Sequence, residues 1–236
     1  MKYALLILLI PFVFAIPQLN DFVTDDAGIL TPEEENSIFL LAKEVEQKTS
    51  VEIAIVTVNS LEGLNIEQYA VEIFEKNGIG KEDVDNGLLI LIVPSERKYR
   101  IEVGYGLEGV LPDIKAREIG VNTLEPYFKN EKYGEGIYEA IKVIKGYIEQ
   151  DESVISEYQS RYEVREESSG WKWIYFIILV LIILSFFRKR KGFFFFPVFF
   201  PTTRGGFSGG TGGFGSSGFG GFGGGLSGGG GFSGGW

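Results

Sequence analysis

Cysteine and histidine are both absent from the 236-residue sequence. Without them the protein cannot form thiol nucleophiles, Ser-His-Asp triads, haem ligation through histidine or zinc sites built on cysteine and histidine. Any chemistry therefore falls to carboxylates, Arg, Lys, Tyr, Ser or Thr. The lack of cysteine also fits an exported protein that does not use disulfides, although it does not identify the compartment.

Acidic residues are absent from the C-terminal part of the chain. All 32 of them lie between Asp21 and Glu167, and 15 of the 22 basic residues lie in the same span. That span therefore has 15 positive against 32 negative charges, a formal charge of −17. A surface of this sign repels nucleic acid and attracts cations, so we expect no nucleic-acid partner.

Two apolar runs flank the acidic part. The first, Tyr3–Phe14, is too short to span a bilayer and predicts a signal peptide over residues 1–15, with an uncleaved anchor as the alternative. The second, residues 171–187, predicts one transmembrane helix. Basic residues 188–191 follow it, so the positive-inside rule predicts a single-pass cell-membrane protein with its domain outside and its tail in the cytoplasm.

Residues 20–148 are enough for one compact domain. Thr31, Pro32 and Glu34 form a capping box that starts a helix, and Asn65 and Asn77-Gly78 bound a second helix. A β-branched strand is predicted between these helices, a hairpin after them, and two further helices at the end. The predicted strand covers 51–58, the hairpin strands cover 88–93 and 99–105, the third helix starts at Pro112-Asp113, and the fourth carries Ile137 to Ile148.

This order of elements predicts an α/β fold, an α/β/α sandwich with a small mixed sheet that contains a β-hairpin. Residues 149–170 are polar and acidic, typical of a stalk or an exposed helix. Residues 188–236 combine a basic flank with a tail rich in glycine and phenylalanine. The 45 residues from Gly192 hold 20 glycines and 11 phenylalanines, a composition that predicts disorder.

The hairpin carries the first candidate site. Its turn residues Asp85-Asn86-Gly87 precede one strand, and Gly104, Gly106 and Glu108 follow the other. An antiparallel hairpin brings these two ends together. Gly104 and Gly106 are interpreted as a tight structural turn, or alternatively as backbone that lets a ligand come close.

The combined motifs resemble the TPM family, named for thylakoid-lumen, photosystem II repair and acetylcholine-receptor-modulator members. The resemblance covers roughly residues 20–148 and extends to the signal, single span and glycine-rich tail of many bacterial members. It implies an α/β/α domain on the outer side of a membrane, divalent-cation binding in some members and acid-phosphatase activity in some. The matching segments are VTDDAGILTPEEE (23–35), VEIAIVTVNSLEG (51–63), DNGLLILIV (85–93), RIEVGYGLEG (100–109) and LPD (111–113).

Four acidic residues in these motifs are candidate ligands for Ca²⁺ or Mg²⁺: Asp25, Asp85, Asp113 and Glu108. The alternative is that Asp25 and Asp85 only fix turns and Asp113 only caps a helix. Asp25 can join the other three residues only if the helix that starts at Thr31 begins at the same end of the sheet as the hairpin ends. That arrangement requires the strand over 51–58 to run parallel to the second hairpin strand, which periodicity does not decide.

Two functions follow from this inventory. The first is a cation-binding interaction or assembly module for envelope or membrane complexes. The second is a metal-assisted acid phosphatase for extracytoplasmic phosphate esters, in which Asp25 or Asp85 binds metal or attacks, and Arg97 or Arg100 binds phosphate. Against the second, the sequence has no phosphate-cradling glycine loop that leads into a helix. Arg100 and Glu102 share one strand face, where a surface ion pair would be worth at most ~1 kcal/mol.

Overall fold

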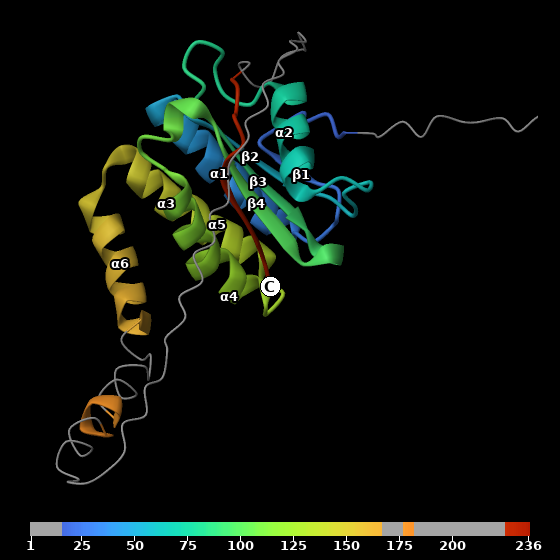
Figure 1. Ribbon diagram of the computed structural model, residues 1–236. Coiled ribbons are helices and arrows are strands. Elements are labelled where there is room, and N and C mark those ends of the chain that lie inside the picture. The colour runs from blue at the N-terminus through green and yellow to red at the C-terminus, as the bar shows by residue number, and fades with distance from the viewer. Residues whose placement is uncertain (1–15, 167–176, 182–224) are drawn as a thin grey trace, which may run out of the picture. The chain divides into compact units, whose positions relative to one another are not determined.

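The computed structural model describes residues 16–166, 177–181 and 225–236. The chain divides into two units, one that contains residues up to Tyr158 together with the C-terminal segment, and one that covers Gln159–Gly215. The first unit contains the sheet and the helices packed on it (Figure 1). Every contact discussed below lies within this unit.

The predicted elements follow one another in the expected order, and the structure adds the first and last strands and several short helical segments. The strands are β1 (Val23–Asp25), β2 (Glu52–Thr57), β3 (Gly87–Val93), β4 (Lys98–Val103) and β5 (Gly230–Gly235). The α-helices are α1 (Pro32–Thr49), α2 (Ile66–Asn77), α3 (Asp113–Ile119), α4 (Glu125–Phe128), α5 (Tyr133–Glu149) and α6 (Glu152–Glu166). Two 3₁₀ turns, η1 (Pro94–Glu96) and η2 (Tyr105–Leu107), and a π-helical segment, η3 (Gly120–Leu124), complete the described elements.

Side-chain caps set the helix starts. At α1, Thr31 Oγ1 accepts a hydrogen bond from Glu34 N, while Glu34 Oε2 accepts one from Thr31 N, so the predicted capping box is present. At α2, Asn65 Oδ1 accepts from Gln68 N over 2.7 Å, and Gly78 ends the helix in the left-handed conformation. Since these caps use only local residues, they could be predicted from the sequence.

The sheet is mixed and has the order β1-β2-β3-β4-β5. Strands β1, β2 and β3 are parallel, whereas β4 runs antiparallel to both of its neighbours, β3 and β5. The predicted α/β fold with a mixed sheet and a hairpin is therefore confirmed. The strand β2 runs antiparallel to β4, which is the opposite of what a shared site with Asp25 requires.

Helices cover both faces of this sheet. Helix α2 packs on one face, and α1, α3 and α5 lie on the other (Figure 1). Because strand side chains alternate between faces, one set of β-strand residues packs against α2. That set includes Ala54, Val56, Leu89, Leu91 and Val93, all of them buried with Ile73 and Phe74 of α2.

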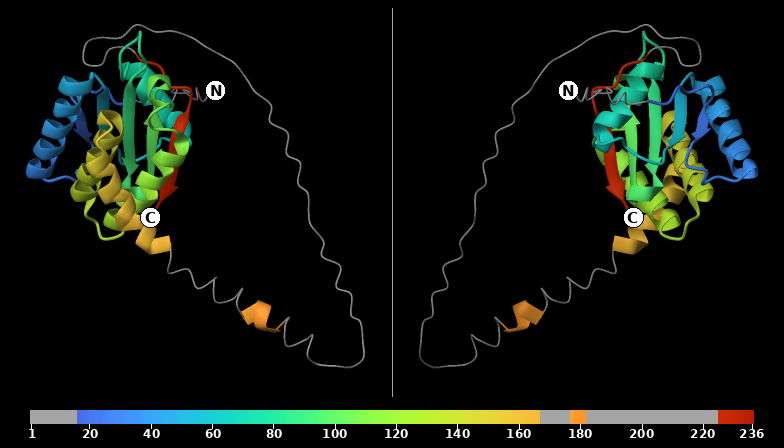
Figure 2. Two further views of the ribbon diagram at one scale, coloured as in Figure 1. Left: turned by 90° about the vertical axis from the view of Figure 1, so that its left-hand side faces the viewer. Right: turned by 90° about the vertical axis from the view of Figure 1, so that its right-hand side faces the viewer.

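The end of the tail differs from the prediction. The sequence predicts disorder for residues 188–236, but Gly230–Gly235 form the fifth strand, next to β4 (Figure 2). The prediction fails there because it weighs glycine entropy alone and ignores the long-range contacts described below.

The predicted membrane elements fall largely outside the described residues. Residues 1–15 lie outside them entirely, and of the predicted span 171–187 only residues 177–181 are described, as helix. Among the residues that the structure does describe, no helix has the length and hydropathy needed to cross a bilayer. The predicted stalk over 149–170 contains helix α6.

Candidate peptide-binding site

A strand from the C-terminal end of the chain extends the sheet at β4. All six residues of β4 pair with β5, from Lys98 opposite Gly235 to Val103 opposite Gly230. Four of the six β5 residues are glycine, which has low intrinsic strand propensity. The strand therefore depends on contacts with the domain. We call residues 225–236 the tail strand and the surface along β4 that receives it the β4 edge.

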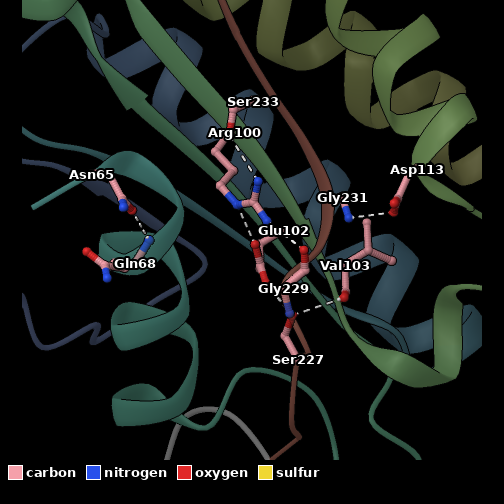
Figure 3. Close-up of polar contacts among 10 residues, drawn as sticks. All are labelled: Asn65, Gln68, Arg100, Glu102, Val103, Asp113, Ser227, Gly229, Gly231 and Ser233. Atoms are coloured by element: carbon pink, nitrogen blue, oxygen red, sulfur yellow. Dashed lines mark hydrogen bonds and ion pairs between the residues drawn. The ribbon is translucent and has the colours of Figure 1, made fainter. Parts of the chain in front are cut away.

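An ion pair lies at the centre of the β4 edge. Arg100 Nε is 2.5 Å from Glu102 Oε2, and the two side chains are 5% and 0% exposed. Arg100 also donates to the tail strand, through Nη1 to Ser233 Oγ and through Nη2 to the carbonyl of Gly229, each over 2.9 Å (Figure 3). The predicted pairing of Arg100 with Glu102 is therefore confirmed, but its predicted place at the surface is wrong, because the pair is buried beside the tail strand.

Glu102 binds the tail strand with its other oxygen. Ser227 Oγ donates to Glu102 Oε1. The same Ser227 Oγ lies 3.2 Å from the carbonyl oxygen of Val103 (Figure 3). Burial raises the pKa of Glu102, and the hydrogen bond from Ser227 and the charge of Arg100 offset this shift only in part. On α2, a hydrogen bond with Ser233 lowers the pKa of Glu67.

Two predicted site residues accept backbone hydrogen bonds from the tail strand. Leu226 N donates to Asp85 Oδ1 and Gly231 N donates to Asp113 Oδ1, each over 2.7 Å. Figure 3 shows the second of these contacts. Glu108 lies close by, because a Cβ built on Gly230 would come within 2.9 Å of Glu108 Oε1. The hairpin thus places Asp85, Glu108 and Asp113 along one peptide.

Asp113 does not cap its helix as the alternative interpretation predicted. It is the first residue of α3, the residue before it is Pro112, and no side chain caps that helix end. Its carboxylate is free to face the tail strand, and it still lies in the first turn, where the helix dipole favours a negative charge.

Aromatic rings anchor the last residue of the chain. Trp236 has ring-centroid distances of 4.8 Å to Phe128, 5.9 Å to Tyr133 and 6.5 Å to Tyr99. Phe232 lies 6.2 Å from the same Tyr99 ring. Trp236 directly follows β5, four residues after Phe232, and both side chains reach Tyr99 on the face that α3 and α5 cover.

Glycine is required where the tail strand comes closest to β4. Gly231 has a φ of +123°, and a Cβ there would lie 1.9 Å from the carbonyl oxygen of Ile101. At Gly234 a Cβ would lie 2.3 Å from Tyr99 Oη. The β4 edge therefore accepts glycine at these two positions and excludes larger residues.

The remaining candidate ligand, Asp25, lies at the other end of the sheet. Asp25 pairs with Thr57, and Thr57 pairs with Ile92 near the end of β3, whereas Asp85 precedes the start of β3 at Gly87. Along β3, Ile92 lies five residues after Gly87, a distance of about 17 Å at ~3.3 Å per residue, so Asp25 and Asp85 lie at opposite ends of the strand. An ion that binds oxygen at ~2.3–2.6 Å cannot join Asp25 to Asp85.

Asp25 instead fixes the turn before α1. Its carboxylate accepts hydrogen bonds from Ile29 N over 3.2 Å and Leu30 N over 2.9 Å, and also from Thr57 Oγ1. Within residues 16–166, 177–181 and 225–236, no group of three acidic side chains is arranged to hold a metal ion. The four-residue cation site that the sequence suggested is therefore not assembled in the described residues.

The two candidate phosphate-binding residues are also separated. Arg97 is exposed in the left-handed conformation at the hairpin turn, at the same end of the sheet as Asp25. Arg100 is enclosed by Glu102, Ser233 and Gly229. Gly104 and Gly106 serve the close backbone approach at the opposite end, since Gly106 N donates to the carbonyl oxygen of Asp85 over 3.0 Å.

A family model described as the TPM domain matches residues 23–147 of the chain. The chain belongs to the TPM-domain family. The TPM domain thus comprises β1 to α5, and the tail strand lies outside the matched range. The resemblance noted in the sequence motifs is confirmed.

The chain is also similar to plant proteins and to solved bacterial domains. The chain is 25% identical over 127 residues to UPF0603 chloroplastic proteins of Oryza sativa subsp. indica and subsp. japonica, which covers 53% of this chain and 42% of each relative. The match thus spans less than half the length of these relatives. The solution NMR structure of the N-terminal domain of a protein from P. gingivalis is 32% identical, with a TM-score of 0.51, over 55% of this chain and 82% of that one. An N-terminal domain from Corynebacterium glutamicum is 21% identical, with a TM-score of 0.44, over 61% and 88%.

Proposed function

We propose that this TPM domain is an interaction module that binds an extended glycine-rich peptide by adding it as a strand to β4. One observation carries the proposal: the β4–β5 ladder, in which the added strand comes from far along the chain, with Ser233 133 positions after its partner Arg100. Strand addition gains affinity from main-chain hydrogen bonds and specificity from alternate side chains. Here the alternate side chains are Ser233 toward Arg100 and Phe232 toward Tyr99.

The proposal includes a membrane setting. The apolar residues 171–187 and the basic residues after them support attachment to a membrane, and the charge of the acidic domain supports partners other than nucleic acid. An assembly role in membrane or envelope complexes suits a module whose main feature is a sheet that accepts an added strand at β4. A phosphatase has less support, because its candidate residues are divided between the two ends of the sheet.

The test uses the full-length protein with a protease site inserted between residues 211 and 220. After cleavage, a labelled peptide with the sequence of residues 225–236, GLSGGGGFSGGW, is added in excess over the cut tail and allowed to exchange with it, and its binding is measured by fluorescence anisotropy. We expect saturable binding. The same peptide with Trp236→Ala should bind about tenfold more weakly, which corresponds to a loss of about 1.4 kcal/mol of ring contacts.

Two controls define the outcome. A peptide with Gly231→Val should not bind, because the added side chain meets the Ile101 carbonyl. An Asp83→Asn variant of the protein should bind as the wild type does, because Asp83 is exposed and outside the site, whereas Asp85→Asn should bind more weakly. If the wild-type peptide does not bind, or if purified protein turns over phosphate esters and Asp85→Asn abolishes that turnover, the proposed function is wrong.

A further inference from the structure

The six residues of β5 occur twice in this sequence. Gly230–Gly235 read GGFSGG, and the same six residues stand at positions 205–210. We call these the outer and the inner hexapeptide. The part of the chain that the structure describes offers one edge, β4, that pairs with such a strand. Each chain therefore carries two copies of the bound sequence for one described acceptor.

The contacts that hold β5 depend on the sequence of the strand and not on its connection to the domain. The ladder uses the six backbone units of the hexapeptide, Arg100 binds the Ser233 hydroxyl, and Tyr99 contacts the Phe232 ring. An identical segment from a second chain would make identical contacts, as in exchange of an element between protomers.

The length of the connection allows this exchange. Residues 167–224 lie between the end of α6 and the tail strand, and an extended chain covers at most ~3.3–3.6 Å per residue. Fully extended, a connection of 58 residues would reach at most roughly 190–210 Å, and even with residues 177–181 in a helix its reach exceeds the size of one domain. The length of the chain does not confine either hexapeptide to its own β4 edge.

We propose that the β4 edge also binds the GGFSGG strand of a second copy of this chain, so that tails link neighbouring copies. This inference rests on the proposed function and names the partner. The acidic TPM domain of one copy also attracts the basic residues after Gly170 of another copy, because this attraction does not require both groups to belong to one chain.

The flanks of the two hexapeptides differ and predict an order of affinity. The outer hexapeptide ends in Trp236, whereas Thr211 follows the inner one. The inner hexapeptide is preceded by Thr203 and Arg204 at the positions that correspond to Gly228 and Gly229. A Cβ at Gly228 would meet Tyr105 Oη at 2.0 Å, so the inner flank cannot follow the same path. A chain that lends its outer hexapeptide to a neighbour can still fill its own edge with the weaker inner one.

The test co-expresses two full-length chains that carry different affinity tags and measures their co-purification from detergent. Three matched variants change the glycine before a phenylalanine: Gly231→Val in the outer hexapeptide, Gly206→Val in the inner one and Gly213→Val outside both. Wild type and Gly213→Val should co-purify equally. Gly231→Val should reduce co-purification severalfold, and the double variant Gly206→Val/Gly231→Val roughly tenfold or more.

Each alternative outcome overturns the inference. If the tags do not co-purify in the wild type, or if the double variant co-purifies as well as the wild type, tails do not link copies through β4. The single variant Gly206→Val controls for folding, because it lies outside the described contacts and should leave the melting temperature unchanged while it lowers co-purification about twofold. Peptide binding without co-purification rejects this inference alone, whereas the absence of peptide binding rejects the proposed function as well.

Discussion

Arg100 and Glu102 form an ion pair, 2.5 Å between Nε and Oε2, that the tail strand buries against the TPM domain. Removal of two charges from water costs several kcal/mol, and the mutual attraction restores that energy only when the remaining donors and acceptors are satisfied. The tail strand satisfies them, since Ser227 donates to Glu102 while Ser233 and Gly229 accept from Arg100. The pair therefore links the stability of the domain to the presence of the strand.

The first prediction concerns the loss of one partner of this pair. Arg100→Gln leaves Glu102 buried without its counter-charge, so we expect the free energy of unfolding to fall by about 3–5 kcal/mol. Arg97→Gln is the matched control, because Arg97 is exposed at the hairpin turn and a surface change of this kind is worth about 0.5 kcal/mol or less. Urea unfolding followed by circular dichroism measures both.

A double variant tests whether charge is the cause. Arg100→Gln/Glu102→Gln removes both charges and should regain part of the stability that Arg100→Gln loses. If the double variant is less stable than the wild type by the sum of the two single losses, the two side chains act independently and the pair is not coupled.

The second prediction concerns pH. Burial raises the pKa of Glu102 in the folded state above its ordinary value of 4.5. A raised folded-state pKa means that the folded protein binds the proton more tightly than the unfolded chain does. The resulting stabilisation is fully present below pH 4.5 and is lost as the pH rises through the folded pKa, by about 1.4 kcal/mol for each pH unit between the two values.

Comparison with Glu102→Gln isolates this effect from other acids. Glu44, for example, has its pKa lowered to about 2, first by its hydrogen bond to Lys145, and it therefore favours the folded state less as the pH falls below 4.5. The unfolding free energy of the wild type, minus that of Glu102→Gln, should decrease as the pH rises above 4.5. A difference that is flat or that increases would show that the pKa of Glu102 is not raised.

Local signals predicted most of the TPM domain, and long-range pairing explains what they missed. The cap residues Thr31 and Asn65 predicted the starts of α1 and α2, because each cap bonds within three residues. Strand β5 could not be predicted in this way, because its glycines have low strand propensity and its partners lie more than a hundred positions earlier. The sequence of β4 gave no signal of a covering strand, because alternation of Arg100 and Glu102 with apolar residues is the ordinary pattern of a strand with one solvent-exposed face.

The candidate site was predicted in part for the same reason. The hairpin brought Asp85 to Glu108 and Asp113 because an antiparallel turn determines that geometry. The position of Asp25 depends on whether β2 and β3 pair in parallel, and apolar runs read the same in either direction. Ser227, Ser233 and Trp236 were missed because they lie in the segment that composition assigned to disorder.

The third prediction concerns divalent cations. With the tail strand bound, Asp85 Oδ1 and Asp113 Oδ1 each already accept a backbone N–H, at different points along the peptide. We therefore expect millimolar Ca²⁺ or Mg²⁺ to raise the melting temperature no more than NaCl of matched ionic strength, because only screening of the acidic domain remains. A gain specific to divalent ions, lost in Asp85→Asn and kept in Asp83→Asn, would instead support the cation site that the sequence suggested.

The last prediction concerns the side of the membrane on which the tail ends. A single span over residues 171–187 would place the TPM domain and the tail strand on opposite sides, as the positive-inside rule predicts. The β4–β5 ladder requires both on the same side. We expect the TPM domain and the tail strand to lie on the same side, because specific side-chain contacts accompany the β4–β5 ladder. The positive-inside rule alone does not determine how many times residues 171–200 cross the membrane.

Cysteine labelling decides between these topologies, since the native chain has no cysteine. Ser37→Cys reports on the exposed surface of α1, and Ser217→Cys reports on the tail. In sealed vesicles of defined orientation, a maleimide that cannot cross the membrane should label both variants to the same extent. Detergent provides the control, because both sites must label once the membrane is dissolved. Labelling of Ser37→Cys alone would place the tail on the other side, and β5 could then pair with β4 of neither its own chain nor a neighbour in that membrane.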